Sequence, residues 1–310
     1  MDQFTQIFQR VEKKYLLTEY QYFALRRFLQ GFARVDRYGE TGILNIYYDT
    51  PDFRLIRESI DGPAYKEKLR LRSYGVPTDD SDAFIEIKKK YKGIVYKRRI
   101  DMPYRQAADY LDRTGTQNAT AQVGSSPADG AAGEKISAAA AGIPSVAAEN
   151  AAGIPSETAE SAAEKTSTDI QIRREIEWFF QIYPELGPRM AISYDRIAME
   201  GITDPDFRVT FDRNIRWRTE DLDLEAGNGG REILNPGTYL MELKIRGAAD
   251  PALAYEMSRL GIFPIGFSKY GQGFLAMQKE QMKALRKHAG MYRIPAAVPA
   301  FLQPSASAAV

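Results

Sequence analysis

The sequence predicts an α+β fold in which an antiparallel, eight-stranded β-barrel is flanked by a few helices. Strand-like segments outnumber helical ones, which favours antiparallel pairing over repeated strand–helix–strand units. The predicted strands are 9–17, 42–49, 64–74, 83–91, 94–101, 189–199, 206–213 and 238–246. Lys92 and Gly93, between the fourth and fifth strands, are typical of a tight hairpin turn. A barrel of eight strands has an interior with room for side chains or one ligand.

Four helices are predicted between these strands. Thr18 can cap a helix that continues through Leu29 with its large apolar residues at helical spacing. Further helices are expected over 104–113 and 169–183. A fourth should follow Asp250, because Pro251 suits the first position of a helix.

The chain divides into two halves of one domain, 1–113 and 168–289. The intervening segment, 114–167, is rich in Ala, Gly, Ser and Glu and has almost no large apolar side chain. Such a composition buries too little surface to offset the entropy of ordering, so the segment is predicted to be a disordered insertion. A tolerated loop expansion is favoured over a tether or partner site. Residues 290–310, with three prolines, are expected to form a flexible tail.

Composition excludes several kinds of chemistry. The 310 residues include no Cys and a single His, which rules out disulfides, thiolate metal sites, cysteine nucleophiles and His-based triads. The net charge of +1 decides nothing, because it averages over very different segments. Neither a leader peptide nor a membrane-spanning apolar run is evident, so a cytoplasmic location is expected.

Charged residues alternate with apolar ones along the strands, and this pattern carries the functional prediction. Residues two apart share one face of a strand, so the third strand places Lys66, Lys68, Arg70 and Arg72 together. The same rule places further charged residues on a common face of their strands: Glu86 with Lys88, Lys97 with Arg99, Glu242 with Lys244, and Glu12 with Lys14. The sixth and seventh strands contribute Arg189 and Arg208. For one strand alone, a solvated face is the simpler interpretation.

The strands taken together favour a different interpretation. Between Lys66 and Arg99 there are eleven basic and five acidic residues, and like charges on one face repel unless a polyanion lies among them. If the apolar faces pack outward against helices, the cations point into the barrel and can hold a polyphosphate or a nucleoside triphosphate. The carboxylates of Glu12, Glu86 and Glu242 could pair with these cations or hold Mg²⁺ or Mn²⁺, with Glu242 the first candidate.

At this point the sequence resembles the vacuolar transporter chaperone (VTC) domain family, polyphosphate polymerases of the triphosphate tunnel metalloenzyme superfamily. The resemblance rests on an ordered set of segments: Glu12–Tyr15, Ile46–Thr50, Tyr65–Gly75, Phe84–Lys88, Ile192–Arg196, Phe211–Trp217, Met241–Lys244 and Phe267–Gly271. It implies that Lys14, Arg70, Arg72, Lys88 and Lys269 bind phosphate, as do Lys97 and Arg189, and that Glu242 binds the metal. The sequence departs from the pattern of the family at two positions, with Arg10 in place of an acidic residue and Gly266 in place of a second lysine.

The activity expected from the residues and the resemblance is transfer of the terminal phosphoryl group of ATP to a polyphosphate chain. This reaction needs positioning and charge neutralisation more than a protein nucleophile. Lys68, Arg196, Arg208 and Lys244 are expected to bind substrate as well. A triphosphatase and a non-catalytic polyphosphate or inositol-phosphate binding module remain open. A nucleic-acid binder is disfavoured, because the cations lack aromatic stacking platforms for bases. A membrane-protein partner is compatible with the resemblance, since eukaryotic relatives work attached to a membrane complex.

Overall fold

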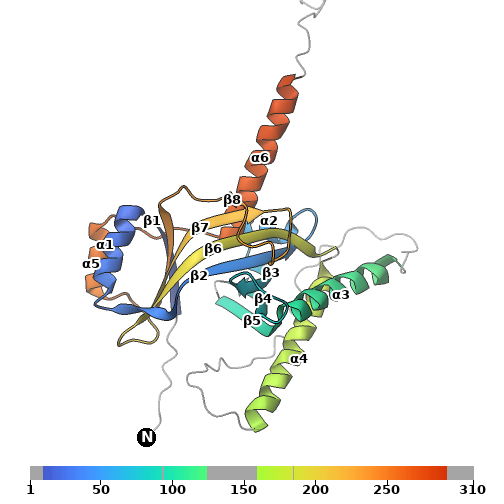
Figure 1. Cartoon of the computed structure of the whole chain (residues 1–310), viewed down its shortest axis with the longest axis horizontal. Helices are drawn as coiled ribbons and strands as arrows, with labels where there is room; N and C mark the ends of the chain where they lie inside the picture. Colours follow the sequence, from blue (N-terminus) through green and yellow to red (C-terminus); the bar gives the residue numbers. More distant parts are fainter. Residues whose placement is uncertain (1–9, 93, 124–158, 184, 292–310) are drawn as a thin grey trace, which may run out of the picture.

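The computed structural model describes residues 10–92, 94–123, 159–183 and 185–291. Within this part of the chain, one antiparallel sheet of nine strands is combined with six helices, so the predicted α+β class is confirmed. Figure 1 shows the sheet at the centre, with α1 and α5 at one end and α3 and α4 at the other.

All strand pairs are antiparallel, in the order β1-β9-β7-β6-β2-β3-β4-β5, and β8 pairs with β7. The strands are β1 (Arg10–Thr18), β2 (Ala33–Asp49), β3 (Tyr65–Tyr74), β4 (Asp82–Tyr91), β5 (Ile94–Pro103), β6 (Gly187–Gly201), β7 (Arg208–Arg218), β8 (Arg231–Glu232) and β9 (Thr238–Arg246). All eight predicted strands are present. Over the described residues β1 and β5 do not pair, so the hydrogen-bonded ring that a closed barrel requires stays open.

Two of the predicted helices, α3 and α4, extend further than the sequence predicted. They are α1 (Glu19–Leu29), α2 (Arg54–Asp61), α3 (Tyr104–Val123), α4 (Ala159–Ile182), α5 (Pro251–Arg259) and α6 (Lys269–Met291). The predicted starts of α1 and α5 are confirmed: Thr18 forms a capping box with Gln21, and α5 begins at Pro251, with Asp250 accepting hydrogen bonds from its first turn. Helices α2 and α6 were not predicted.

The boundaries of the insertion need a correction. Helix α3 continues to Val123 and α4 begins at Ala159, so both ends of the segment 114–167 are helical, contrary to the predicted disorder. Residues 124–158, where the same prediction also falls, lie outside the described residues, as do residues 292–310 of the tail. Alanine favours a helix intrinsically, which is why an Ala-rich composition alone does not mark the point where each helix ends.

The outer face of the sheet carries two apolar layers. Leu69, Leu71, Ile85 and Ile87 are buried in one core cluster that includes residues of α3 and α4. A second cluster joins the alternate residues of β1, β7 and β9 to α1 and α5. Each fully buried aliphatic side chain of this kind stabilises the fold by about 1.5–3 kcal/mol. Because the apolar faces pack outward against helices, the charged faces point inward, as predicted.

The first turns of α6 fill part of the inner face. Tyr270, Phe274 and Met277 form a third core cluster with residues of β2, β6 and β7. A Cβ atom at Gly273 would lie 2.9 Å from both Ile192 Cδ1 and Met190 Sδ, so only glycine allows α6 to approach β6 this closely. The distal part of α6 extends away from the sheet (Figure 1).

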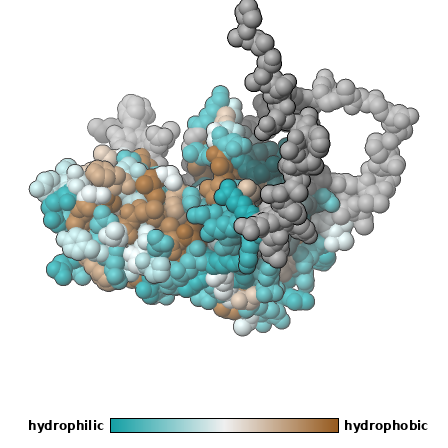
Figure 2. All heavy atoms as spheres, turned by 90° about the horizontal axis from the view of Figure 1, so that it is seen from above, coloured by the Kyte–Doolittle hydropathy of each residue, from teal (hydrophilic) through white to brown (hydrophobic). Residues whose placement is uncertain are grey.

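Surface polarity differs along the molecule. On the face seen in Figure 2, apolar residues gather towards the half that carries α1 and α5. Exposed side chains at this end include Phe23, 56% exposed, and Phe263, 66% exposed. The predicted cations lie mainly on the inner face of the sheet, described next.

Candidate phosphate-binding site

The strand register brings the predicted charges onto one inner face. Lys68 of β3 lies opposite Lys88 of β4, which in turn lies opposite Lys97 of β5. Directly opposite residues of neighbouring strands project to the same side of a sheet. The same register places Arg70 beside Glu86, Lys14 beside Glu242, Glu12 beside Lys244, and Lys244 beside Arg208. We call this set of residues the basic face.

The segment before α6 joins the two ends of the basic face. Lys14 Nζ of β1 donates to the Phe267 carbonyl at 3.0 Å, and Lys68 Nζ of β3 donates to Ser268 Oγ at 3.0 Å. The Ile265 amide also bonds to the Lys14 carbonyl at 2.8 Å. Lysines from strands far apart in the sheet therefore meet on one short segment, so the sheet curls around this segment although its two edge strands do not pair in the part of the chain that the structure describes.

The electrostatics show the same convergence. Burial lowers the pKa of Lys14, Glu242 partly restores it, and the charges of Lys269 and Lys88 lower it further. Burial also lowers the pKa of Lys68 to about 7, helped by the positive charges of Lys88 and Lys14. Repulsion between these ammonium groups requires them to be near one another. Four lysines from β1, β3, β4 and α6 thus share one site that favours an anion.

Glu86 lies at the centre of a cationic cluster on β3–β5. Its side chain is only 1% exposed, and Arg70 binds Oε2 through Nε at 2.7 Å and Nη2 at 2.6 Å. Lys97 Nζ lies 2.7 Å from Oε1, and Arg72 Nη1 lies 3.8 Å from Oε2. Burial alone would raise the pKa of Glu86, but the three cations lower it to about 2. Both carboxylate oxygens are therefore occupied by cations of this chain.

Two polar residues of β2 hold the arginines in place. Tyr47 accepts a hydrogen bond from Arg70 Nη1 at 3.1 Å, and buried Asn45 accepts one from Arg72 Nε at 2.9 Å. The Asn45 amide donates in turn to the Ile192 carbonyl at 2.9 Å. Sequence reasoning did not select Tyr47 or Asn45, but their alternation on β2, once its register with β3 is known, identifies them.

A second cationic cluster surrounds the carboxylate of Asp212 and includes residues of β6, β7 and α6. Fully buried Asp212 accepts two hydrogen bonds from Arg196, at 2.6 and 2.9 Å, and an ion pair from Lys269 at 2.5 Å. Burial opposes ionisation of Asp212, yet Lys269 and Arg196 lower its pKa to about 2. Lys269 also lies 4.3 Å from the ring centroid of Tyr194. Burial would raise the Tyr194 pKa, but Arg196, Arg72 and Lys269 lower it to about 8.

Glu242 and Glu12 are the acidic residues of the basic face on β9 and β1. Glu242 Oε1 lies 3.0 Å from Lys244 Nζ, while its Oε2 and a Glu12 oxygen each lie 3.9 Å from Lys14 Nζ. Burial opposes ionisation of Glu242, yet Lys244 and Lys14 lower its pKa to about 2. No group of three or more His, Cys, Asp or Glu residues that could hold a metal occurs among the described residues. Two carboxylates fit Mg²⁺ or Mn²⁺ only if phosphate oxygens and water complete the coordination.

Two predicted residues lie at the margins of the site. Arg208 ends the basic face on β7, where its side chain is exposed. Arg189 lies at the end of β6, and its guanidinium donates to the carbonyls of Asp49 at 3.3 Å and Glu185 at 3.1 Å. The hydrogen bonds of Arg189 thus go to backbone carbonyls at this end of β6 and not to residues of the basic face.

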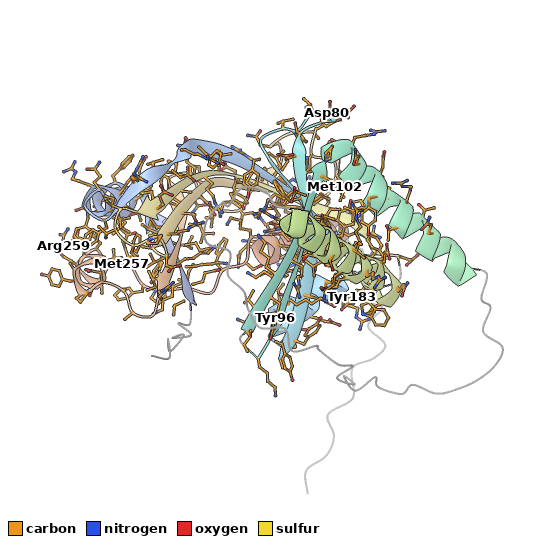
Figure 3. All side chains as sticks on the ribbon, turned by 90° about the horizontal axis from the view of Figure 1, so that it is seen from below. Asp80, Tyr96, Met102, Tyr183, Met257 and Arg259 are labelled. Carbon is orange, nitrogen blue, oxygen red and sulfur yellow. The ribbon has the colours of Figure 1, made fainter. Side chains whose placement is uncertain are left out.

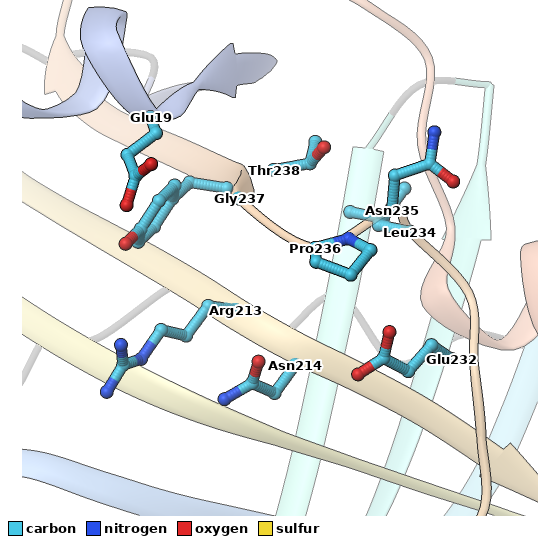
Figure 4. A pocket seen from close by; sticks show the side chains of 10 residues that line it. Glu19, Arg213, Asn214, Glu232, Leu234, Asn235, Pro236, Gly237 and Thr238 are labelled. Atoms are coloured by element: carbon cyan, nitrogen blue, oxygen red, sulfur yellow. The ribbon is translucent and has the colours of Figure 1, made fainter.

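A separate polar pocket lies between β7 and the segment that leads into β9 (Figure 4). Glu19, Arg213 and Glu232 line it. Arg213 is occupied by a two-pronged ion pair with Glu40, at 2.7 and 2.9 Å. The pocket shares no residue with the basic face.

Across the described part of the chain, no helix combines the length and the apolar character that crossing a membrane requires.

Among the solved structures that this chain resembles are three with low sequence identity. A candidate adenylate cyclase from Vibrio parahaemolyticus is 11% identical, with a TM-score of 0.36, over 86% of this chain and 97% of that one. A candidate adenylyl cyclase from Hippeastrum, reported with a dominant triphosphatase activity, is 12% identical, with a TM-score of 0.45, over 86% and 96%. A candidate adenylate cyclase from Bacillus halodurans is 12% identical, with a TM-score of 0.41, over 84% and 93%.

Comparison with curated proteins gives no match. A family model described as the VTC domain matches residues 9–278, which include every strand and the first turns of α6. The match covers well over half of the chain and contains all the residues of the basic face. The chain therefore belongs to the VTC domain family.

Proposed function

We propose that this protein is a polyphosphate polymerase that transfers the terminal phosphoryl group of ATP to a polyphosphate chain held against the basic face. The observation that carries the proposal is the convergence of Lys14, Lys68, Lys88 and Lys269 from four separate elements. Clustered ammonium groups without enough carboxylates to neutralise them are costly unless an anion binds. Membership of the VTC domain family supports the same substrate class.

The residues of the site divide into three roles in this proposal. Lys14, Lys88 and Lys269 contact phosphate oxygens as point charges. Lys68, Lys97 and Lys244 extend this phosphate-binding surface. Arg70, Arg72 and Arg196 neutralise the charge that builds on the transferring group, since a guanidinium can fork onto two oxygens. Glu86 and Asp212 hold these cations in fixed positions, so that little reorganisation is needed when the phosphoryl group moves.

A divalent ion fits the carboxylate pair of Glu242 and Glu12 with phosphate oxygens as further ligands. When bound there, Mg²⁺ or Mn²⁺ would offset negative charge on the phosphate oxygens. Because cations already occupy both oxygens of Glu86, we assign Glu86 to positioning and leave metal binding to Glu242 and Glu12. The nucleophile is an oxygen of the acceptor phosphate, so no side chain needs to form a covalent intermediate.

Incubation of the purified chain with ATP and Mn²⁺ or Mg²⁺ tests the proposal. Long polyphosphate, resolved on a gel, is the expected product, and Lys88→Met should abolish it. Arg34→Met is the matched control, because Arg34 is an exposed cation paired with Glu200 on the surface. Formation of orthophosphate alone would instead establish a triphosphatase. Binding of polyphosphate without any metal-dependent turnover would establish a binding module and refute the polymerase.

A further inference from the structure

The two ends of the basic face differ in chemistry. The face runs along β3, β4 and β5 between the loop that contains Asp80 and the hairpin near Tyr96, which lie at opposite ends in Figure 3. At the hairpin end the inward positions are held by Lys66, Lys88, Lys90 and Lys97. The Asp80 end carries two aromatic residues on the same face, Tyr74 and Phe84. The prediction that no aromatic stacking platform accompanies the cations is therefore wrong at this end.

Register and contacts define this aromatic platform. Phe84 lies directly opposite Arg72, and the Phe84 and Tyr74 rings meet edge to face with their centroids 5.4 Å apart. The Arg99 guanidinium lies over the Phe84 ring, with Cζ 4.6 Å from the centroid. Tyr74 is 51% exposed, and both Phe84 and Arg99 are reachable from solvent. Aromatic rings and arginine planes of this kind stack against nucleobases whatever the base.

From these observations we propose that Tyr74, Phe84 and Arg99 form a nucleobase-binding site, which holds the base of a nucleoside triphosphate whose phosphates lie along the lysines. This inference rests on the proposed function, and it adds the orientation of the nucleotide. The Arg99 guanidinium, which lies over the Phe84 ring, moves aside as the base stacks on Phe84, and this long, exposed side chain then covers the other side of the base. The triphosphate then points towards the hairpin end of the face.

The spacing along β4 fits such a ligand. Phe84 and Lys88 are four residues apart on one strand, which corresponds to about 14 Å in an antiparallel sheet. This length is comparable to that of an extended nucleoside triphosphate from its base to its terminal phosphate. Glu86 lies between the two positions, and the cations gathered around it would contact the inner phosphates. The terminal phosphate would reach Lys88, where the four-lysine cluster lies.

Comparison of two ligands separates base binding from phosphate binding. Binding of ATP and of inorganic tripolyphosphate to the full chain is measured by calorimetry in buffer with EDTA, so that no turnover occurs. Phe84→Leu should raise the Kd for ATP by about tenfold, since stacking on one aromatic ring contributes this much to base binding. The Kd for tripolyphosphate should stay unchanged. GTP should lose affinity to the same degree as ATP, because stacking tolerates either base.

Two further variants complete the test. Tyr74→Leu, at an exposed position, should weaken ATP binding in the same direction and carries the test if Phe84→Leu fails to fold. Tyr96→Leu is the matched control, since Tyr96 is an exposed aromatic residue on the opposite face of β5. This variant should leave the Kd of both ligands unchanged. If Phe84→Leu and Tyr74→Leu weaken the binding of ATP and of tripolyphosphate equally, or leave ATP binding intact, the base site is refuted while the proposed function stands. If the unmodified chain binds neither ligand, both proposals fail.

Discussion

Replacing Glu86 by Gln removes the charge at the centre of the cationic cluster while keeping the size of the side chain. The pKa of Glu86 falls from its usual 4.5 to about 2 in the folded protein. Each unit of such a difference corresponds to about 1.4 kcal/mol, so the ionised carboxylate contributes about 3 kcal/mol to stability at neutral pH. Because the side chain is 1% exposed, solvent screens this interaction little. Glu86→Gln should therefore lower the free energy of unfolding by about 3 kcal/mol at pH 7.

The pH dependence gives this prediction its sign. A carboxylate with a lowered pKa stabilises the fold above pH 4.5, and the contribution is lost as the pH falls towards 2. The gap between the parent and Glu86→Gln should thus narrow over that interval in chemical denaturation experiments. Glu58→Gln is the control, because its pair with Arg54 is about half exposed and should matter by less than about 1 kcal/mol. A gap that keeps its size from pH 7 to pH 3 would refute the electrostatic account of the cluster.

Three other predictions address metal binding, protonation and the placement of α6. Glu242→Gln should abolish metal-dependent turnover but preserve tripolyphosphate binding in EDTA, and parallel loss of both would contradict its role as a metal ligand. Because the pKa of Lys68 is about 7, bound phosphate should raise this pKa, so that the protein takes up roughly half a proton at pH 7 on binding. Calorimetry in buffers of different ionisation enthalpy should detect this proton uptake, and Lys68→Met should eliminate it. If Lys68→Met takes up as much as the parent, another group is responsible. Tyr270→Phe removes the 2.8 Å bond to buried Asp49 that ties α6 to β2 and should destabilise the fold by about 2 kcal/mol, whereas an unchanged denaturation midpoint would show that the tie is dispensable.

The strands and the charged face could be predicted from sequence because both follow from local alternation. In β3, Lys68 and Arg70 alternate with the buried Leu69 and Leu71, and a period of two determines which residues share a face. The inward direction of that face followed from a second inference, that the apolar positions pack under helices. Both steps use neighbours in the sequence and general packing rules.

Cross-strand register could not be read from the sequence, and it decides the roles of individual residues. From the sequence, Glu86 was a weaker candidate metal ligand than Glu242. The ion pairs with Arg70, directly opposite on β3, and with Lys97 on β5 show that both of its oxygens are occupied. The Tyr74–Phe84 contact joins residues from two strands and has no local signature. Helix α6 was missed because Gly271 and Gly273 near its start argue against a helix locally, while the close approach to β6 requires Gly273. That β1 and β5 do not pair within the described residues is likewise a property of the whole sheet.

A crystal structure of the chain with inorganic tripolyphosphate would test the central claim most directly. The account predicts consecutive phosphate groups against the basic face, within hydrogen-bonding distance of Lys14, Lys88 and Lys269. Tripolyphosphate bound elsewhere on the surface, with none of those three ammonium groups in contact with a phosphate oxygen, would contradict it.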